Sequence, residues 1–227
     1  MGKVIMSGIV PQLKAPSTSI LASDLAVGST VKLMENGVAV EYLVVNHGIP
    51  SDSSLYDSSC DGLWLLRKDI YTTMAFDSLN SVYVNSDVHA YLNSTFLGLF
   101  DDVAKSAIKP VKVLADGSQV DATVFLLSCN ELGLVNSSEE ASDEGCKLEY
   151  FEADTAGDSK RIAYLDGAAT SWLTRSAAVN NLTVWAVDET GALDYIAHSN
   201  SQGIRPALIL PSTAVFDNET LILKGVT

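Results

Sequence analysis

The clearest alternation of apolar and polar positions lies near the start of the chain, where residues 31–35 and 38–45 flank Asn36-Gly37. Asn-Gly between two such runs is the strongest short-range signal for a β-hairpin, because both residues tolerate a positive φ. Two further pairs of apolar runs, each around a turn that contains glycine, also predict paired strands: residues 184–187 with 192–196, and residues 111–114 with 120–127. Residues 63–66 predict a short buried strand.

Helical spacing of apolar residues is limited to short stretches in the middle of the chain. Ser86 is a suitable N-cap for a helix whose apolar residues recur three and four positions apart: Val88, Tyr91 and Leu92. A second helix is expected to begin at Asp101 or Asp102 and to stop before Pro110. Ser128 and Glu131 have the spacing of a capping box, which predicts another short helix.

The C-terminal part of the chain alternates between strongly apolar segments and segments without periodicity. Two apolar segments, residues 172–176 and 203–211, each contain one arginine. Between them, residues 177–183 and 197–202 have neither helical nor strand periodicity, and they flank the hairpin predicted above. A rigid frame that displays irregular polar loops is the usual layout of a recognition surface.

Several of these segments together resemble a known family. The motifs are Trp-Leu-Thr-Arg-Ser at residues 172–176 and Gly-Ile-Arg-Pro-Ala-Leu-Ile-Leu-Pro at residues 203–211, with four further stretches in matching order: residues 7–16, 65–71, 85–93 and 124–128. They resemble phage and gut-bacterial proteins of the DUF6273 type, which have a C-type-lectin-like fold and are related to variable ligand-binding proteins diversified by retroelements. Relative to that pattern, Ala177 replaces a usual proline and the loop after it is one residue shorter.

The resemblance implies an α+β fold, namely a C-type-lectin-like domain over residues 25–227 with two helices and loop-rich mixed or antiparallel strands. Residues 1–24 contain Pro11, Pro16 and a run of Ser and Thr, so they are expected to form an extended arm or linker. In a phage protein such an arm would dock the domain onto other virion subunits. The simpler interpretation of residues 1–24 is a loose terminus.

Composition narrows the class of partner. The chain has 227 residues, of which 47% are hydrophobic and 19% charged, as in globular proteins. A formal net charge of −14 is unsuited to nucleic acid, whose phosphates require clusters of Lys and Arg, and to anionic membranes. No segment approaches the ~20 apolar residues of a membrane helix, and the first residues lack a signal-peptide pattern. Cys60, Cys129 and Cys146 show no paired spacing, which favours synthesis in a reducing cytoplasm.

Residues capable of catalysis or metal binding are scattered. His47, His89 and His198 lie far apart in the sequence and outside any triad or metal motif. The Glu-Pro-Asn, Gln-Pro-Asp and Trp-Asn-Asp signatures of calcium-dependent lectins are absent. Four acidic residues in the region 136–158 lack the spacing of a calcium loop and are expected to be solvated: Glu139, Glu140, Asp143 and Glu144. The sequence therefore predicts no catalytic residue, no metal and no cofactor.

Trp172, Arg175 and Arg205 lie in apolar, strand-like surroundings, where an unpaired guanidinium group would be unfavourable. A functional interpretation makes the two arginines ligand clamps. A structural interpretation makes them buried anchors that donate hydrogen bonds to carbonyl or carboxylate oxygens and hold the loops. The structural interpretation is favoured, because the resembling family keeps this pattern while the loops between the arginines differ.

The predicted ligand-binding residues lie in the two aperiodic loops and on the hairpin between them: Ala177, Ala178, Asn180, Asn181, Thr183, Trp185, Tyr195, Ala197, His198 and Asn200. The loop residues are types that can be reached by altering adenines in Asn codons, as retroelement diversification does. Trp185 and Tyr195 are candidates for exposed aromatic anchors. Inward packing of Trp185 is the open alternative, since strand faces alternate.

These features predict a non-enzymatic ligand- or receptor-binding protein at a phage tail or fibre tip. Its expected partner is a bacterial cell-surface protein or glycan, contacted through residues 177–202, and a homotrimer would suit a fibre tip. The alternatives are a structural virion protein that contacts only other subunits, and an enzyme on a fold like that of the formylglycine-generating enzyme. The bacterial cell surface is the alternative location to the virion.

Overall fold

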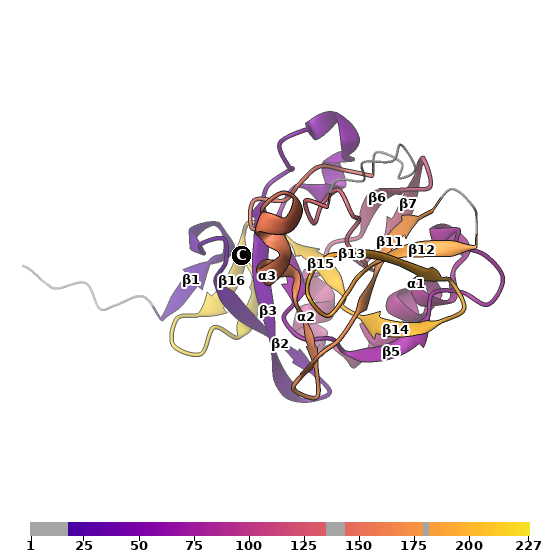
Figure 1. The fold of residues 1–227 in the computed structure, drawn as a ribbon. Helices are drawn as coiled ribbons and strands as arrows, with labels where there is room; N and C mark the ends of the chain where they lie inside the picture. The colour runs from indigo at the N-terminus through magenta and orange to yellow at the C-terminus, as the bar shows by residue number, and fades with distance from the viewer. Residues whose placement is uncertain (1–17, 135–143, 179–181) are drawn as a thin grey trace, which may run out of the picture.

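Two five-stranded sheets form the centre of the fold (Figure 1). The computed structural model describes residues 18–134, 144–178 and 182–227. The first sheet is antiparallel and has the order β2-β3-β4-β15-β8, with these bounds: β2 (Thr30–Glu35), β3 (Val38–His47), β4 (Leu63–Arg67), β15 (Ala207–Leu210) and β8 (Val124–Phe125). The second has the order β13-β12-β11-β14-β5: β13 (Leu193–Ala197), β12 (Thr183–Val187), β11 (Trp172–Ala177), β14 (Ser201–Ile204) and β5 (Thr72–Ala75).

Strands β4 and β15 lie in the middle of the first sheet. Residues 63–66 and 207–210 are all buried, and a strand covered on both faces has a continuous apolar run rather than an alternating one. The ring of Trp64 in β4 packs edge-on against the rings of Tyr56 and Phe125, with ring centroids 5.7 Å apart in both pairs. The buried strand predicted at residues 63–66 is therefore confirmed.

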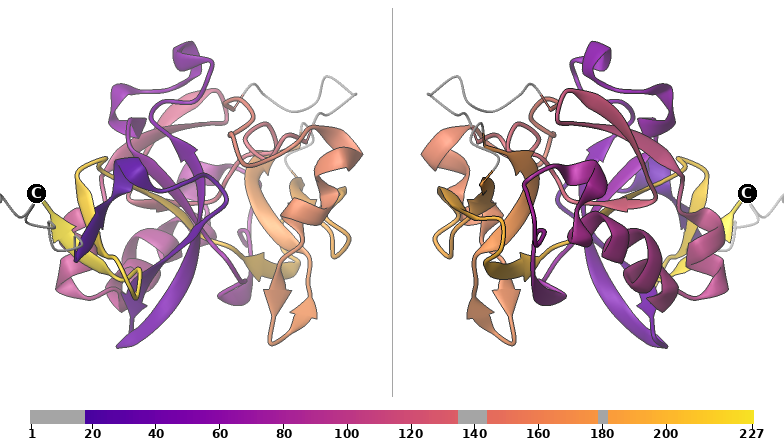
Figure 2. Two further views of the ribbon diagram at one scale, coloured as in Figure 1. Left: turned by 90° about the vertical axis from the view of Figure 1, so that its left-hand side faces the viewer. Right: turned by 90° about the vertical axis from the view of Figure 1, so that its right-hand side faces the viewer.

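Three small sheets complete the strand structure of the described residues. The sheet β1-β16-β17 consists of β1 (Ser19–Leu21), β16 (Ala214–Asp217) and β17 (Leu223–Val226). The other two are hairpins: β6 (Val111–Ala115) with β7 (Ser118–Ala122), and β9 (Tyr164–Leu165) with β10 (Ala168–Ala169). Figure 2 shows the β9–β10 hairpin and the tip of the β2–β3 hairpin projecting in the same direction.

The helices are short. α1 (Asp87–Tyr91) begins after Ser86, whose hydroxyl accepts a hydrogen bond from the His89 N–H, as the sequence predicts. It continues into a π turn, η5 (Leu92–Phe96), and a 3-10 turn, η6 (Leu97–Leu99). α2 (Asp102–Ala107) is capped by Asp101. In the part of the chain that the structure describes, the remaining elements are α3 (Asp158–Arg161) and five 3-10 turns: η1 (Ala22–Asp24), η2 (Ser53–Leu55), η3 (Ser58–Cys60), η4 (Tyr83–Asn85) and η7 (Asp154–Gly157).

The predicted fold class, an α+β C-type-lectin-like domain, is wrong. The protein consists mostly of β structure, with 40% strand and 19% helix, divided among several small sheets. The two predicted helices form, but α1 covers five residues and α2 six. α2 ends because Ile108 is extended (φ −65°, ψ 126°), as expected two residues before Pro110. Most of the apolar runs pair into sheets instead.

The predicted hairpins show which sequence signals are reliable. Asn36 and Gly37 have φ angles of 49° and 78°, so the β2–β3 hairpin has the left-handed turn that Asn-Gly favours. The hairpin β12–β13 is also confirmed, with Trp185 directly opposite Tyr195.

The predicted strand over residues 120–127 is divided in two. β7 pairs with β6, whereas β8 joins the first sheet beside β15. At the break, the side-chain oxygen of Asn93 accepts hydrogen bonds from the N–H groups of Thr123 and Val124, at 2.7 and 3.2 Å. A side chain from η5 therefore takes the place of ladder bonds at this position.

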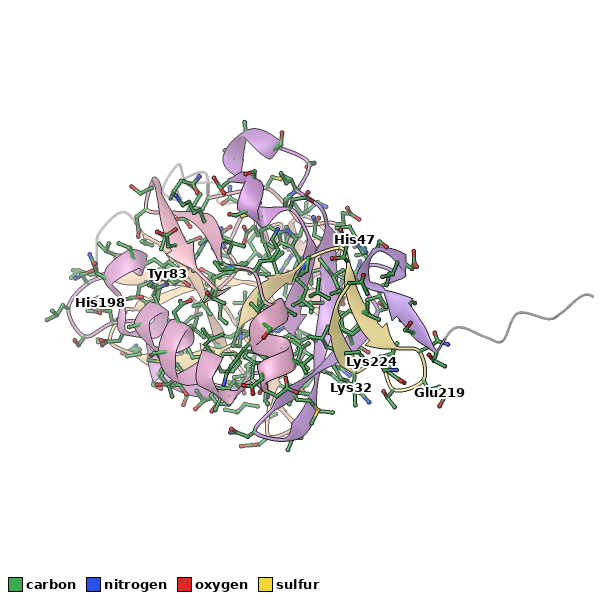
Figure 3. All side chains as sticks on the ribbon, turned by 180° about the vertical axis from the view of Figure 1, so that it is seen from behind. Lys32, His47, Tyr83, His198, Glu219 and Lys224 are labelled. Atoms are coloured by element: carbon green, nitrogen blue, oxygen red, sulfur yellow. The ribbon has the colours of Figure 1, made fainter. Side chains whose placement is uncertain are left out.

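Both ends of the described chain lie in the sheet β1-β16-β17. Residues 19–24, which the sequence assigns to the arm, form β1 and η1, and Ala22 is fully buried there. Residues 1–17 of that arm lie outside the described residues. Lys224 and Glu219 lie at this end of the molecule and His198 at the opposite end (Figure 3). Within the described ranges, no helix combines the length and apolarity needed to cross a membrane.

Candidate functional site

Arg175 is fully buried and is bonded through every N–H of its guanidinium group. Two short hydrogen bonds, at 2.6 and 2.7 Å, join Nη1 and Nη2 to the two carboxylate oxygens of Glu131. The remaining donors bond to three main-chain carbonyl oxygens, those of Leu114, Leu126 and Glu144. Because a guanidinium group has five N–H donors, none is left for a ligand.

The charge of Arg175 is stabilised by these contacts. Burial alone would lower the pKa of the guanidinium group, but the charge and hydrogen bonds of Glu131 raise that pKa above its ordinary value. Glu131 is itself fully buried, so the two groups form an ion pair removed from water. A buried pair of this kind holds its surroundings in place, since separating it would leave an uncompensated charge.

Glu131 belongs to the capping box predicted from the sequence. Its N–H donates to the Ser128 hydroxyl (3.1 Å), and its carboxylate accepts from the Ser128 N–H (3.0 Å). Only a single turn follows instead of the predicted helix, and it ends at Gly133, where φ is 72°. The same carboxylate therefore closes the turn and anchors Arg175.

Glu144 differs from the solvated acid that the sequence predicts. Its side chain is fully buried, and its two carboxylate oxygens accept hydrogen bonds from the Asp116 N–H (2.9 Å) and the Ser176 hydroxyl (2.6 Å). The expectation of a solvated loop is wrong for this residue, because non-local partners satisfy its carboxylate. The other three acids of that prediction, Glu139, Glu140 and Asp143, lie outside the described residues.

Arg205 is also buried, but its three hydrogen bonds go to carbonyl oxygens alone: those of Arg67, Lys68 and Arg161, at 3.0, 3.1 and 3.2 Å. Burial lowers its pKa to about 10, so the guanidinium group stays charged at neutral pH. The group lies over the ring of Trp172, 5.0 Å from the centroid. The indole N–H of Trp172 donates to the same Arg161 carbonyl, at 3.0 Å.

A third buried arginine, Arg161, was not identified from the sequence. Its guanidinium group donates to the carbonyl oxygens of Gly191, Leu132 and Glu152 and pairs with Asp158 at 2.6 Å. Arg161 stands in a polar stretch, Asp158-Ser159-Lys160-Arg161, where no apolar pattern marks it as buried. We refer to Arg161, Arg175 and Arg205 with these partners as the arginine frame.

The hairpin β12–β13 extends from this frame, and β13 is an edge strand of the second sheet. Tyr195 in β13 is 63% exposed, whereas Trp185 opposite it is only 8% exposed. The two rings meet edge-to-face with centroids 5.8 Å apart. The buried Trp185 ring therefore packs against the exposed Tyr195 ring, and Trp185 is not itself an exposed anchor. Its buried indole N–H has no hydrogen-bond partner among the described residues.

The other predicted site residues divide between surface and interior. Thr183 and Ala197, a cross-strand pair, share a face with Trp185 and Tyr195 and are half-buried. Ala177 is half-buried, Ala178 is buried and Asn200 is exposed. Asn180 and Asn181 lie outside the described residues.

His198 is a buried residue that links neighbouring chain segments through hydrogen bonds, and it is not an exposed contact residue. It is 9% exposed, and its Nδ1 lies 2.8 Å from the Asp77 carbonyl oxygen. Its main-chain N–H donates to the Leu182 carbonyl, and its own carbonyl accepts from the N–H groups of Phe76 and Asp77. Non-local main-chain pairing of this kind has no signature in the sequence.

Three chain segments therefore meet around His198. The segment after β5 turns at Asp77, whose carboxylate accepts hydrogen bonds from the N–H groups of Leu79, Asn80 and Asp87. These bonds outweigh burial and lower the Asp77 pKa. Leu79 is 80% exposed and Leu182 is 63% exposed; sequence analysis did not select either of them. We name the exposed residues of these segments the display end: Leu79, Leu182, Tyr195 and Asn200.

Comparison with known proteins gives a family and no activity. Residues 61–212, more than half of the chain, match a family model described as a domain of unknown function, DUF6273. The chain belongs to the DUF6273 family. No curated protein and no solved structure matches it. The DUF6273 region begins just before β4 and ends after β15, so it contains the arginine frame and the display end but not β1–β3, β16 or β17.

Two cysteines and two histidines of this DUF6273 chain, Cys60, Cys129, His47 and His89, are engaged in packing. Burial raises the pKa of the Cys129 thiol to about 12 and that of Cys60 to about 11, so neither is a thiolate at neutral pH. His47 lies 2.8 Å from the Leu25 carbonyl, and burial lowers the pKa of His89, whose ring lies beside the Asn93 amide. Among the residues described, no three His, Cys, Asp or Glu side chains form a group suited to a metal ion.

Proposed function

We propose that this protein is a non-enzymatic recognition protein that binds a ligand on a bacterial surface through its display end. The observation that carries the proposal is the exposed ring of Tyr195, which is held by Trp185 on an edge strand. A second exposed apolar side chain, Leu182, directly precedes β12 of the same hairpin. Recognition surfaces concentrate their binding energy in a few such aromatic and apolar residues on a fixed support.

The arginine frame favours a division of roles in which buried residues hold the fold and exposed residues bind the ligand. Arg175 uses all five of its N–H groups within the fold, so it acts as an anchor and leaves recognition to exposed residues. An enzymatic alternative finds less support, because the thiols and imidazoles described above are buried or bonded within the fold. We therefore propose that the protein binds its ligand without catalysing a reaction.

The arrangement of the two ends favours a particle-bound protein. The sheet β1-β16-β17 lies at the opposite end of the molecule from the display end (Figures 1 and 3). A protein that attaches through its N-terminal region would then point its display end outward. We propose the phage tail or fibre as its location, on the strength of the family resemblance; the alternative is a virion subunit that contacts only other subunits.

Binding to whole cells tests the proposal. Labelled protein is incubated with a panel of gut bacteria, alongside the triple variant Leu182→Ala, Tyr195→Ala, Asn200→Ala and a control variant, Val226→Ala, altered at an exposed position of β17. We expect the parent and the control to bind the same strains, and the triple variant to lose that binding while it keeps the parent's melting temperature. Equal binding by the triple variant would place the site elsewhere. Absence of binding to any strain would favour the structural subunit.

A further inference from the structure

A groove of about 700 Å³ lies between two hairpins, away from the display end. One wall is β3, at Val40 and Glu41, and the other is the β9–β10 hairpin, at residues 164–167. Arg67, at the end of β4, and residues 68–71, which connect β4 to β5, form its floor. Figure 2 shows the two hairpins that flank this groove projecting in the same direction, apart from each other.

The floor of the groove is fixed by main-chain hydrogen bonds to both walls. The Lys68 N–H donates to the Glu41 carbonyl of β3, and the Ile70 N–H donates to the Tyr164 carbonyl of β9. The N–H groups of Arg67 and Tyr71 bond to the strand region around Arg205, at the carbonyls of residues 206 and 204. The guanidinium group of Arg205 also donates hydrogen bonds to the carbonyl oxygens of Arg67 and Lys68. The groove is therefore preformed, which lowers the entropy lost on binding.

The cations of the groove are already neutralised. Arg67 pairs with the buried Glu35 at 3.1 Å, and Lys68 pairs with Glu41 at 2.6 Å. Asp69 and Asp166 add two acids to the lining, in a chain whose net charge is −14. An anionic ligand would meet unfavourable charge here. A neutral ligand whose groups both donate and accept hydrogen bonds could donate to the carboxylates and accept from the paired cations at the same time.

The groove also offers aromatic surface. Tyr164 is 46% exposed on one wall. Tyr71, at the end of the floor, is held by Arg67 on its ring face (5.4 Å to the centroid) and by the edge-to-face ring of Phe96 (4.9 Å). Aromatic rings of this kind pack against flat apolar surface while adjacent polar groups fix its orientation.

We propose that this groove binds a neutral oligosaccharide. Sugar hydroxyls both donate and accept hydrogen bonds, as the mixed charges of the lining require, and the C–H face of a sugar ring would pack on Tyr164. An extended peptide fits less well. Four N–H groups of the floor are bonded within the fold, so they cannot form the main-chain ladder by which a peptide strand is usually recognised. The site is separate from the display end and does not depend on the function proposed for it.

The test is a titration of isotope-labelled protein followed by amide NMR shifts. The probes are maltohexaose, cellohexaose, mannohexaose and hexa-N-acetylchitohexaose, with chondroitin sulfate as an anionic comparison. We expect at least one neutral hexasaccharide to give saturable shifts at residues 40–41, 67–71 and 164–167. Tyr164→Ala should weaken that binding about tenfold or more, since one aromatic contact is worth about this factor. Tyr195→Ala, altered at the display end, should bind the sugar like the parent.

Three results would overturn the saccharide site. They are the absence of shifts with all four neutral sugars at millimolar concentration, shifts with chondroitin sulfate alone, and unchanged sugar binding by a folded Tyr164→Ala variant. The amide spectrum of Tyr164→Ala itself reports whether the variant is folded. Loss of sugar binding in Tyr195→Ala would move the sugar to the display end, and would also contradict the separation of the two sites.

Discussion

Arg175 of the arginine frame and Tyr195 of the display end lie in the same sheet, in β11 and β13, yet one side chain is buried and fully bonded while the other is exposed. Around Arg175, a buried guanidinium group meets a buried carboxylate and three carbonyls. At the display end, Leu182 and Tyr195 expose most of their side chains to water. Changing a buried, fully bonded group leaves its partners unsatisfied, whereas changing an exposed side chain usually alters stability little. Under the proposed function, the buried arginine frame would provide stability and the exposed side chains would provide recognition.

The largest effect is expected for Arg175→Ala. This change leaves the buried Glu131 carboxylate without its counter-charge, so the free energy of unfolding should fall by about 4 kcal/mol. Denaturant unfolding followed by tryptophan fluorescence measures it. The double variant Arg175→Met, Glu131→Leu removes both charges and should lose less than the single variant. A single variant within about 1 kcal/mol of the parent would contradict the buried pair as the main anchor.

Arg205→Ala should have the next largest effect, a loss on the order of 3 kcal/mol, because three carbonyl oxygens lose their donor but no carboxylate is left unpaired. Arg205→Lys, which keeps a cation, should lie between this variant and the parent. The same unfolding measurement applies. If Arg205→Ala keeps the parent's stability and loses binding to cells, Arg205 is a ligand contact and the division drawn above fails at this residue.

Asp77 supports the display end, because its carboxylate holds the loop that carries Leu79. Removing three hydrogen bonds by Asp77→Ala should cost about 2 kcal/mol. The lowered pKa of Asp77 means that its contribution is complete above the unfolded pKa of about 3.9 and is lost as the pH falls through the folded value. The stability difference between the parent and Asp77→Ala should thus narrow below about pH 4. A difference that stays constant from pH 7 to about pH 2 would show that the charge is irrelevant.

The smallest effect is expected at the display end itself. The triple variant Leu182→Ala, Tyr195→Ala, Asn200→Ala should change the free energy of unfolding by less than about 0.5 kcal/mol per position. Calorimetric melting of the variant and the parent checks this. If the variant unfolds at room temperature, these side chains belong to the core, and the comparison between frame and display end does not hold.

Local signals in the sequence predicted local structure well. Asn36-Gly37 specified its hairpin because two adjacent residues alone set the turn, and Ser86 and Asp101 marked helix starts because a cap bonds within three residues. Helix length was less predictable. The residues after α1 form π and 3-10 turns, and the polar side chain of Asn93 in η5 bonds to the distant residues 123 and 124.

The features that could not be predicted depend on residues far apart in the chain. Glu131 and Arg175 are separated by 44 positions, so the capping box was visible in the sequence but its role as an anchor was not. Arg161, Glu144 and His198 stand in stretches without apolar periodicity, and each is buried by non-local partners. The sequence predicted the β12–β13 hairpin correctly, but it could not separate the exposed Tyr195 from the supporting Trp185.

The position of β13 at the margin of its sheet has a consequence for self-association. An edge strand can template pairing with another chain, which is a route to aggregation. Here the strand is five residues long and carries the exposed Asp194 next to Tyr195. A second copy aligned against it would bring like charges together, in a chain whose net charge is already −14. The acidic charge beside the exposed ring therefore opposes pairing of a second chain along β13, and this opposition weakens as salt screens the repulsion.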